Sequence, residues 1–158
     1  MKKTRVLDLF CGIGGSSVEA ESTGLVEIVA GVDCWDIAIE TYSFNFPNTH
    51  PILGNLFEID PHNLKGAIGD IDLIMASPEC TSHSVARGAL AKDEQSLDTA
   101  LLVPKFVKEF LPKWVIIENV IQMRTWHKYC QLYHELEILG YHVAEVVLNA
   151  VRRLYAHS

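Results

Sequence analysis

The chain has 158 residues and a mass of 17.7 kDa, enough for one domain with a hydrophobic core and too little for two of ordinary size. It is 49% hydrophobic and 21% charged without long Pro-, Gly- or Ser-rich tracts, which excludes disordered and collagen-like classes. The net charge of −7 argues against a chain that grips nucleic acid unaided through a broad basic face. No apolar run approaches the roughly 18 residues of a membrane span, so we expect a cytoplasmic protein with no membrane contact.

Short apolar runs alternate along the chain with longer segments of helical periodicity, which is typical of a parallel sheet with helices on both faces. The sequence predicts strands over residues 6–10, 28–32, 51–53, 71–76, 114–117 and 142–148. It predicts helices over residues 17–22, 36–46, 97–110 and 121–138, a polar stretch after residue 53 and a long loop over 82–96. We therefore expect an α/β fold with three layers, α/β/α, around a mostly parallel sheet.

Polar or reactive residues follow these strands at their carboxyl ends, where ligands bind in open parallel α/β sheets. They are Gly12, Gly14 and Gly15 in the first turn, then Asp33, Asn55, Cys80 and Glu118. The positions share one edge of the predicted sheet, so together they indicate a site.

The glycine-rich turn after the first strand can bring backbone N–H groups and a helix start close to a ligand. Its spacing is not the GxGxxG pattern that receives a pyrophosphate, which argues against a nucleotide-dependent dehydrogenase. Asp33 lies where a carboxylate can accept both ribose hydroxyls of a nucleoside. The pair favours a nucleoside-containing cofactor. The alternative for the glycine-rich turn is an ordinary βα turn, and the alternative for Asp33 is an acidic helix start.

Cys80 and Glu118 are the candidate reactive residues. Cys80 follows a strongly apolar strand and precedes the predicted loop, although a buried cysteine is more often inert. Glu118 leaves the strand over residues 114–117, where we expect burial to let its carboxyl group donate a proton or hydrogen bond near neutral pH. The alternative for Glu118 is a helix start with Asn119 as the N-cap.

The order of these segments resembles the motif series of the DNA cytosine-5 methyltransferases. The resemblance rests on Asp8-Leu9-Phe10-Cys11-Gly12-Ile13-Gly14-Gly15, Asp33, Ser77-Pro78-Glu79-Cys80 and Glu118-Asn119-Val120. It covers almost the whole chain and implies a Rossmann-like, S-adenosylmethionine-dependent methyltransferase fold. It also implies a methyltransferase of the kind found in restriction-modification systems.

The resemblance implies a covalent mechanism. Cys80 would add to C6 of cytosine so that C5 becomes nucleophilic, while Glu118 would hold N3 and Asn119 would support the turn. The target cytosine would be flipped out of the DNA, and the loop over residues 81–96 would close over it. A tRNA cytosine-5 methyltransferase would use the same chemistry, so that relative stays open.

The resemblance also implies which residues bind S-adenosylmethionine. They are Phe10, Cys11, Gly12, Ile13, Gly14, Gly15, Asp33, Cys34, Asn55, Leu56 and Pro78. Asn55 stands where the family usually has an acid, and its carbonyl oxygen can still accept a hydrogen bond from an adenine amino group. Glu79 and Thr81 flank Cys80 where the family usually has Pro and Gln, and a neighbouring carboxylate disfavours a thiolate.

The family continues with an arginine-bearing strand, a target-recognition domain and a closing C-terminal segment. We expect all three to be absent from residues 1–158, which would then be a partial cofactor-binding and catalytic domain with an unfinished sheet edge. A second polypeptide or self-association would cover that edge. The alternative is an inactive remnant that binds S-adenosylmethionine or a partner without turnover.

A metal site is the remaining alternative. His127, Cys130 and His134 share one face of a predicted helix and could present three ligands to zinc. The proposed chemistry needs no metal, so we expect none.

Overall fold

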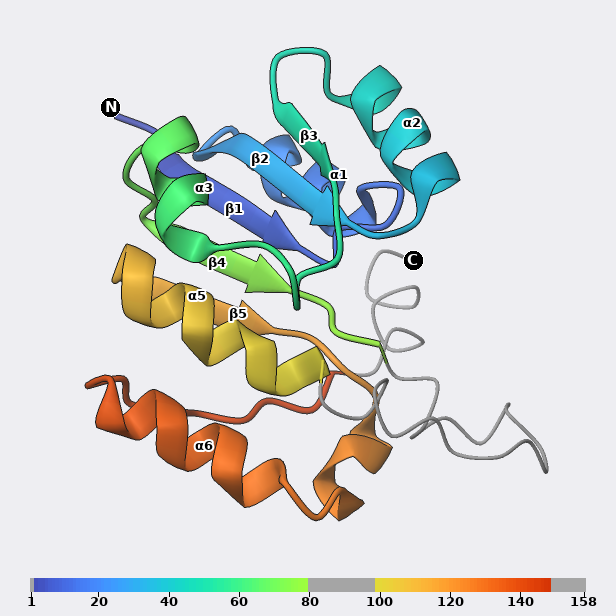
Figure 1. Ribbon diagram of the computed structural model, residues 1–158. Helices are drawn as coiled ribbons and strands as arrows, with labels where there is room; N and C mark the ends of the chain where they lie inside the picture. Colours follow the sequence, from blue (N-terminus) through green and yellow to red (C-terminus); the bar gives the residue numbers. More distant parts are fainter. Residues whose placement is uncertain (1, 80–98, 149–158) are drawn as a thin grey trace, which may run out of the picture.

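The computed structural model describes residues 2–79 and 99–148, in which the strands form one sheet of order β3-β2-β1-β4-β5 (Figure 1). The strands are β1 (Thr4–Leu9), β2 (Val26–Asp33), β3 (His50–Leu53), β4 (Leu73–Ala76) and β5 (Trp114–Ile117). All neighbours pair in parallel, so every carboxyl end lies on the same edge of the sheet. Five of the six predicted strands are thereby confirmed.

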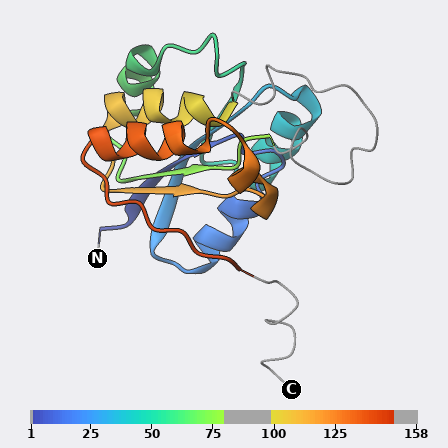
Figure 2. The same ribbon diagram turned by 90° about the horizontal axis from the view of Figure 1, so that it is seen from below.

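Helices cover both faces of this sheet. They are α1 (Gly15–Ser22), α2 (Asp36–Asn45), α3 (Pro61–Ile68), α5 (Val103–Phe110) and α6 (Tyr129–Ile138), with 3-10 turns η2 (Thr99–Leu102) and η3 (Ile121–Thr125). Figure 2 shows α3, α5 and α6 on one face and α1 on the other. The predicted three-layer α/β/α architecture is confirmed. Within the described ranges no helix has the length and apolar character to span a bilayer.

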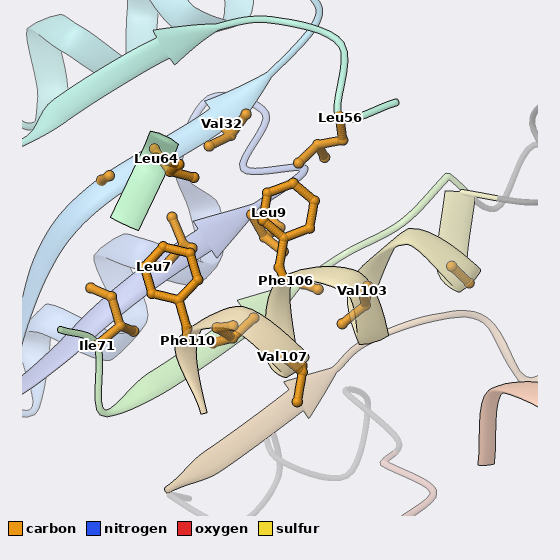
Figure 3. Packing of buried hydrophobic residues seen from close by; sticks show 14 of the residues in the cluster. Leu7, Leu9, Val32, Leu56, Leu64, Ile71, Val103, Phe106, Val107 and Phe110 are labelled. Carbon is orange, nitrogen blue, oxygen red and sulfur yellow. The ribbon is translucent and has the colours of Figure 1, made fainter. Parts of the chain in front are cut away.

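Two hydrophobic cores sandwich the central strand β1. On one face, Leu7 and Leu9 pack with Phe106 and Phe110 of α5 (Figure 3). On the other face, Val6 belongs to the cluster that includes side chains of α2. The alternation of side chains in β1 therefore fills both cores, as expected of a central parallel strand.

Helix α3 lies in the polar stretch after residue 53, for which no helix is predicted from the sequence. Asp60 caps it by accepting a hydrogen bond from the His62 N–H at 2.9 Å, and Pro61 occupies its first turn. Leu64 and Ile68, four residues apart, are buried in the core. An acidic N-cap followed by proline and an i, i+4 apolar pair is a local helix signal that could have identified α3.

The predicted helix over residues 121–138 is wrong as a single element. The chain forms η3 and then α6, separated at Trp126, whose backbone is extended at φ −71° and ψ 129°. Trp126 is only 5% exposed and packs in the core with Met123. The helix is therefore interrupted where the Trp126 side chain is buried in the core. The helix predicted over 97–110 begins in the described part as η2 and becomes α-helical at Val103.

The strand predicted over residues 142–148 is also wrong. The segment has no strand conformation, and Val146, Val147 and Leu148 are 74%, 60% and 87% exposed. Apolar alternation alone does not make a strand, because each strand needs a hydrogen-bonding neighbour. Side chains hold the segment instead: Tyr141 donates to the Pro112 carbonyl at 2.5 Å, and Arg124 pairs with Glu145.

Candidate active site

The turn after β1, residues 11–15, is called the glycine turn below. It leads from β1 into α1 at the carboxyl edge of the sheet. Phe10, Gly12 and Gly14 have left-handed φ values of 58°, 52° and 95°, and Gly14 is the N-cap of α1. A Cβ atom on Gly14 would lie 2.3 Å from the Phe46 ring, so only glycine fits there.

Asp33 ends β2 beside this turn. Its carboxylate accepts the Gly12 N–H at 2.8 Å and the Trp35 N–H at 2.9 Å, one on each oxygen. Each carboxylate oxygen has a further lone pair for another donor. The sheet thus holds an oriented carboxylate next to open backbone, an arrangement that can accept the two hydroxyls of a ribose.

The turn after β3 brings Asn55 to the same edge, where it is exposed. Its side-chain oxygen accepts the Phe57 N–H at 3.0 Å, which fixes the amide group. Leu56 differs from the rest of the predicted set: its side chain is 3% exposed and packs in the core near Leu9 (Figure 3). Leu56 can therefore border a ligand only through its backbone, whereas Phe57 is 46% exposed.

Two predicted cofactor-binding cysteines have different surroundings. Cys11 is buried, and burial, Asp8 and Asp33 all raise the pKa of its thiol well above the ordinary value. Cys34 is exposed, and its thiol pKa is raised by partial burial and by the carboxylates of Asp33 and Glu79. Both groups are therefore neutral thiols near pH 7 and do not act as nucleophiles there.

The ends of β4 and β5 are linked beyond their strands. The Glu118 N–H donates to the Ala76 carbonyl at 2.9 Å, and the Asn119 side chain donates to the Pro78 carbonyl at 3.0 Å. Pro78 is buried, and Cys80, two residues later, lies outside the described residues. The expected burial of Glu118 is wrong, since its side chain is exposed. Glu118 therefore stands at the carboxyl edge of the sheet with its side chain accessible to solvent.

A buried polar network lies beneath the glycine turn and is not among the features predicted from the sequence. The Ser17 hydroxyl donates to the Asp8 carboxylate at 2.7 Å and lies 3.0 Å from the Tyr42 hydroxyl. Burial, opposed by the Ser17 hydrogen bond, raises the pKa of Asp8 to about 6, with a further contribution from Asp33. An aspartate inside an apolar run was the sequence signal for such a network.

The described residues contain no group of three or more His, Cys, Asp or Glu side chains that could hold a metal ion. His127, Cys130 and His134 all lie within the described part and do not form such a group, and His127 precedes α6.

Comparison with known proteins gives a consistent result. The profile of the family described as C-5 cytosine-specific DNA methylase matches residues 4–153. The type II methyltransferase M.DdeI of Desulfomicrobium norvegicum is 34% identical over 154 residues, which cover 92% of this chain and 36% of that protein. M.HgiDI of Herpetosiphon aurantiacus is 38% identical over 154 residues, which cover 92% of this chain and 46% of that protein. The chain thus spans less than half the length of these relatives.

Solved structures agree with this result. A putative DNA modification methyltransferase encoded within an E. coli prophage superposes with a TM-score of 0.72 and 25% identity, covering 87% of this chain and 37% of that one. A DNMT2 variant of Spodoptera frugiperda superposes with a TM-score of 0.66 and 26% identity, covering 85% and 41%. The match over residues 4–153 includes the glycine turn, Asp33 and the Glu118-Asn119 pair. The chain therefore belongs to the C-5 cytosine-specific DNA methylase family.

Proposed function

We propose that this chain carries the cofactor-binding and catalytic part of a DNA cytosine-5 methyltransferase of a restriction-modification system. The observation that carries the proposal is the hydrogen bond from Asn119 to Pro78, because it ties the segment leading into Cys80 to the end of β5 beside Glu118. Asp33 and the glycine turn lie on the same edge of the sheet. A site for a nucleoside cofactor, Glu118 and the segment that leads into Cys80 thus lie at one edge of the sheet.

The residues at this edge fit S-adenosylmethionine. A Cβ atom placed on Gly12 or Gly15 would meet no described atom within 4 Å, so there is open space beside the turn. Asp33 would accept hydrogen bonds from the ribose hydroxyls, Asn55 would accept one from the adenine amino group, and the backbone of the glycine turn would hold the amino-acid end. When bound, this cofactor supplies the methyl group.

The chain's own residues prepare the cytosine. The Cys80 thiolate forms a bond from its sulfur to C6, which moves electron density onto C5. Glu118, in its protonated form, would donate a hydrogen bond to N3 and so stabilise the negative charge that develops there. After C5 has gained the methyl group, solvent takes the proton from C5, and the electron pair of that C–H bond expels the Cys80 sulfur from C6 as a thiolate. Cys80 is thereby regenerated, and 5-methylcytosine is released.

One side of β5 has no neighbouring strand among the described residues, which supports the need for a covering polypeptide. Trp114 and Ile116 on this strand are 70% and 54% exposed. A cavity of about 660 Å³ is lined by residues of β5, of α6 and of the segment 141–148. Exposed apolar side chains beside an unpaired strand edge favour association. We propose that a second polypeptide carrying the recognition domain covers this surface, and that a second copy of this chain does so when the partner is lacking.

Covalent trapping tests the proposed reaction. DNA substituted with 5-fluorocytosine has no C5 proton to lose, so Cys80 stays bonded to C6 after methyl transfer. We expect an adduct, seen by mass spectrometry, when the chain is mixed with S-adenosylmethionine, this DNA and the remaining part of M.HgiDI supplied in trans. Cys80→Ser should abolish the adduct. Cys130→Ser, which changes an exposed thiol on α6, should leave it intact.

Two results would argue against the proposal. An adduct that survives Cys80→Ser would place the nucleophile elsewhere. Binding of S-adenosylmethionine without any adduct would favour the inactive remnant, which keeps the nucleoside pocket and not the turnover. Adducts with fluorinated tRNA in place of DNA would assign the substrate to RNA.

A further inference from the structure

The glycine turn is held from outside by the carboxyl end of α2, a contact that spans 32 residues of sequence. The Asn45 side-chain amide donates a hydrogen bond to the Ile13 carbonyl at 3.1 Å. The neighbouring Phe46 ring lies so close to Gly14 that a Cβ there would approach it to 2.3 Å. One polar and one apolar contact from α2 therefore meet the turn at adjacent residues.

A second set of contacts seats α2 against the sheet. Tyr42 is fully buried, its hydroxyl lies 3.0 Å from Ser17 in α1, and Ser17 in turn donates to Asp8 in β1. Its ring also fills the space over Gly31, where a Cβ would approach the ring to 2.4 Å. Helix α2 is thus fixed to both strands that flank the candidate cofactor site.

The start of α2 is connected to the other half of that site. The helix begins at Asp36, three residues after Asp33, whose carboxylate binds the Trp35 N–H and the Gly12 N–H. The amino end of α2 therefore follows the ribose-binding carboxylate, and its carboxyl end holds the glycine turn. Helix α2 joins the two parts of the site into one unit.

The contact of Asn45 determines the orientation of a single peptide plane. The Ile13 carbonyl and the Gly14 N–H belong to the same peptide group, and that N–H donates to the Cys11 carbonyl at 2.9 Å. Glycine at position 14 permits this peptide to rotate at little steric cost, and the Ile13 side chain, 54% exposed, gives the turn little anchorage. The peptide is therefore held on its N–H side by the Cys11 carbonyl and on its carbonyl side by the Asn45 amide.

We propose that Asn45 is a positioning residue for the cofactor: it holds the Ile13–Gly14 peptide in the orientation that the methyl donor binds, and Tyr42 keeps α2 in register for this contact. The inference rests on the proposed function for the identity of the cofactor. The hydrogen bond by which Asn45 holds the Ile13 carbonyl is called the clamp below. It rests on the contacts between α2 and the glycine turn, whatever the cofactor is.

The test replaces the amide by a group of the same shape without a donor. Asn45→Asp removes the N–H donor, and Asn48→Asp makes the same chemical change at an exposed residue just after α2. In Asn45→Asp we expect amide hydrogen exchange of residues 12–15 to become about 3- to 10-fold faster and the Kd for S-adenosylmethionine to rise by a similar factor, the range of one hydrogen bond. Asn48→Asp should change neither. Asn45→Gln, which retains a donor, should lie between Asn45→Asp and the unaltered chain.

Exchange at the turn and calorimetric affinity for S-adenosylmethionine, both measured on the full chain, separate the outcomes. Unchanged exchange at residues 12–15 in Asn45→Asp would overturn the clamp. Faster exchange with unchanged affinity would overturn the positioning role. If Asn45→Asp exchanges faster but the unaltered chain does not bind S-adenosylmethionine, the clamp is retained and the proposed cofactor is overturned. Exchange in β1 and β2 should stay constant throughout, which distinguishes the local effect from general destabilisation.

Discussion

The side-chain amide of Asn119 donates a hydrogen bond to the Pro78 carbonyl at 3.0 Å, across the ends of β4 and β5. The Asn119 side-chain oxygen also accepts the Val120 N–H at 2.8 Å. A single side chain therefore shapes the turn after β5 and fixes the segment that leads into Cys80. Loss of its donor should misplace the nucleophile relative to Glu118 while leaving most of the fold intact.

Asn119→Asp removes that donor and keeps the shape of the side chain. We expect trapping on 5-fluorocytosine DNA to slow about fivefold, because one hydrogen bond contributes on the order of 1 kcal/mol. Asn63→Asp, at an exposed position of α3, is the control for added charge. An equal trapping rate in the two variants would show that Asn119 does not position Cys80.

Asp33→Asn should weaken cofactor binding. The carboxylate now accepts the Gly12 and Trp35 N–H groups on separate oxygens, and an amide can accept only one of them. We expect the Kd for S-adenosylmethionine to rise at least about tenfold, since hydrogen bonds to charged groups are worth roughly 1.5–3 kcal/mol. Asp36→Asn, at the exposed start of α2, should have little effect by calorimetry. Wild-type affinity in Asp33→Asn would remove Asp33 from the site.

Asp8 should make stability depend on pH. Its pKa is about 6 in the folded chain and 3.8 for the unperturbed group, so the folded state holds the proton more tightly. Stability should therefore fall as pH rises from about 4 to 6 and stay at the lower level above that. The shift corresponds to roughly 3 kcal/mol at 1.36 kcal/mol per pKa unit.

Urea unfolding of Asp8→Asn between pH 4 and pH 7 measures this contribution. The variant should lose most of the fall in stability over that interval, because its amide does not titrate. Asp70→Asn, at an exposed position, provides the control and should retain the fall. A pH profile of Asp8→Asn that matches the unaltered chain would contradict the assignment.

Two adjacent glycines should respond differently to alanine. Gly14→Ala introduces a Cβ 2.3 Å from the Phe46 ring at a φ of 95°, so we expect a loss of at least about 2 kcal/mol in the free energy of unfolding. Gly15→Ala meets no described atom within 4 Å and should change stability by less than about 1 kcal/mol. Denaturation midpoints of the two variants check the comparison, and equal losses would contradict the close packing at Gly14.

The exposed face of β5 should promote association. Threonine favours strands, so replacing Trp114 and Ile116 by threonine should keep β5. The replacement removes most of the exposed apolar surface that these two side chains contribute to β5. Sedimentation velocity should show less self-association in the double variant than in the unaltered chain. Ile138→Thr, at a helix position 70% exposed, should have little effect. A monodisperse monomer of the unaltered chain at high concentration would count against this surface.

Much of the fold could be predicted locally. Short stretches of sequence are enough to recognise β1, β2 and β4 and the turns after them. Burial in a parallel sheet requires continuous hydrophobic strands, and such runs are visible among neighbouring residues. Residues 142–148 show the limit of such patterns. Their alternation matches a strand, yet a strand forms only where another backbone completes its hydrogen bonds, and that condition lies outside the segment.

The sequence by itself determined that Asp33 and Glu118 stand at the carboxyl ends of strands. The resemblance to the cytosine-5 methyltransferases implied the reaction that this series of motifs carries out. Tertiary structure alone decided the strand order that brings these residues to one edge, the exposure of Glu118, and the contact of Asn45 with Ile13 across 32 residues. Local propensity acts between neighbours in the chain. Contacts between distant residues depend on how the helices pack against the completed sheet.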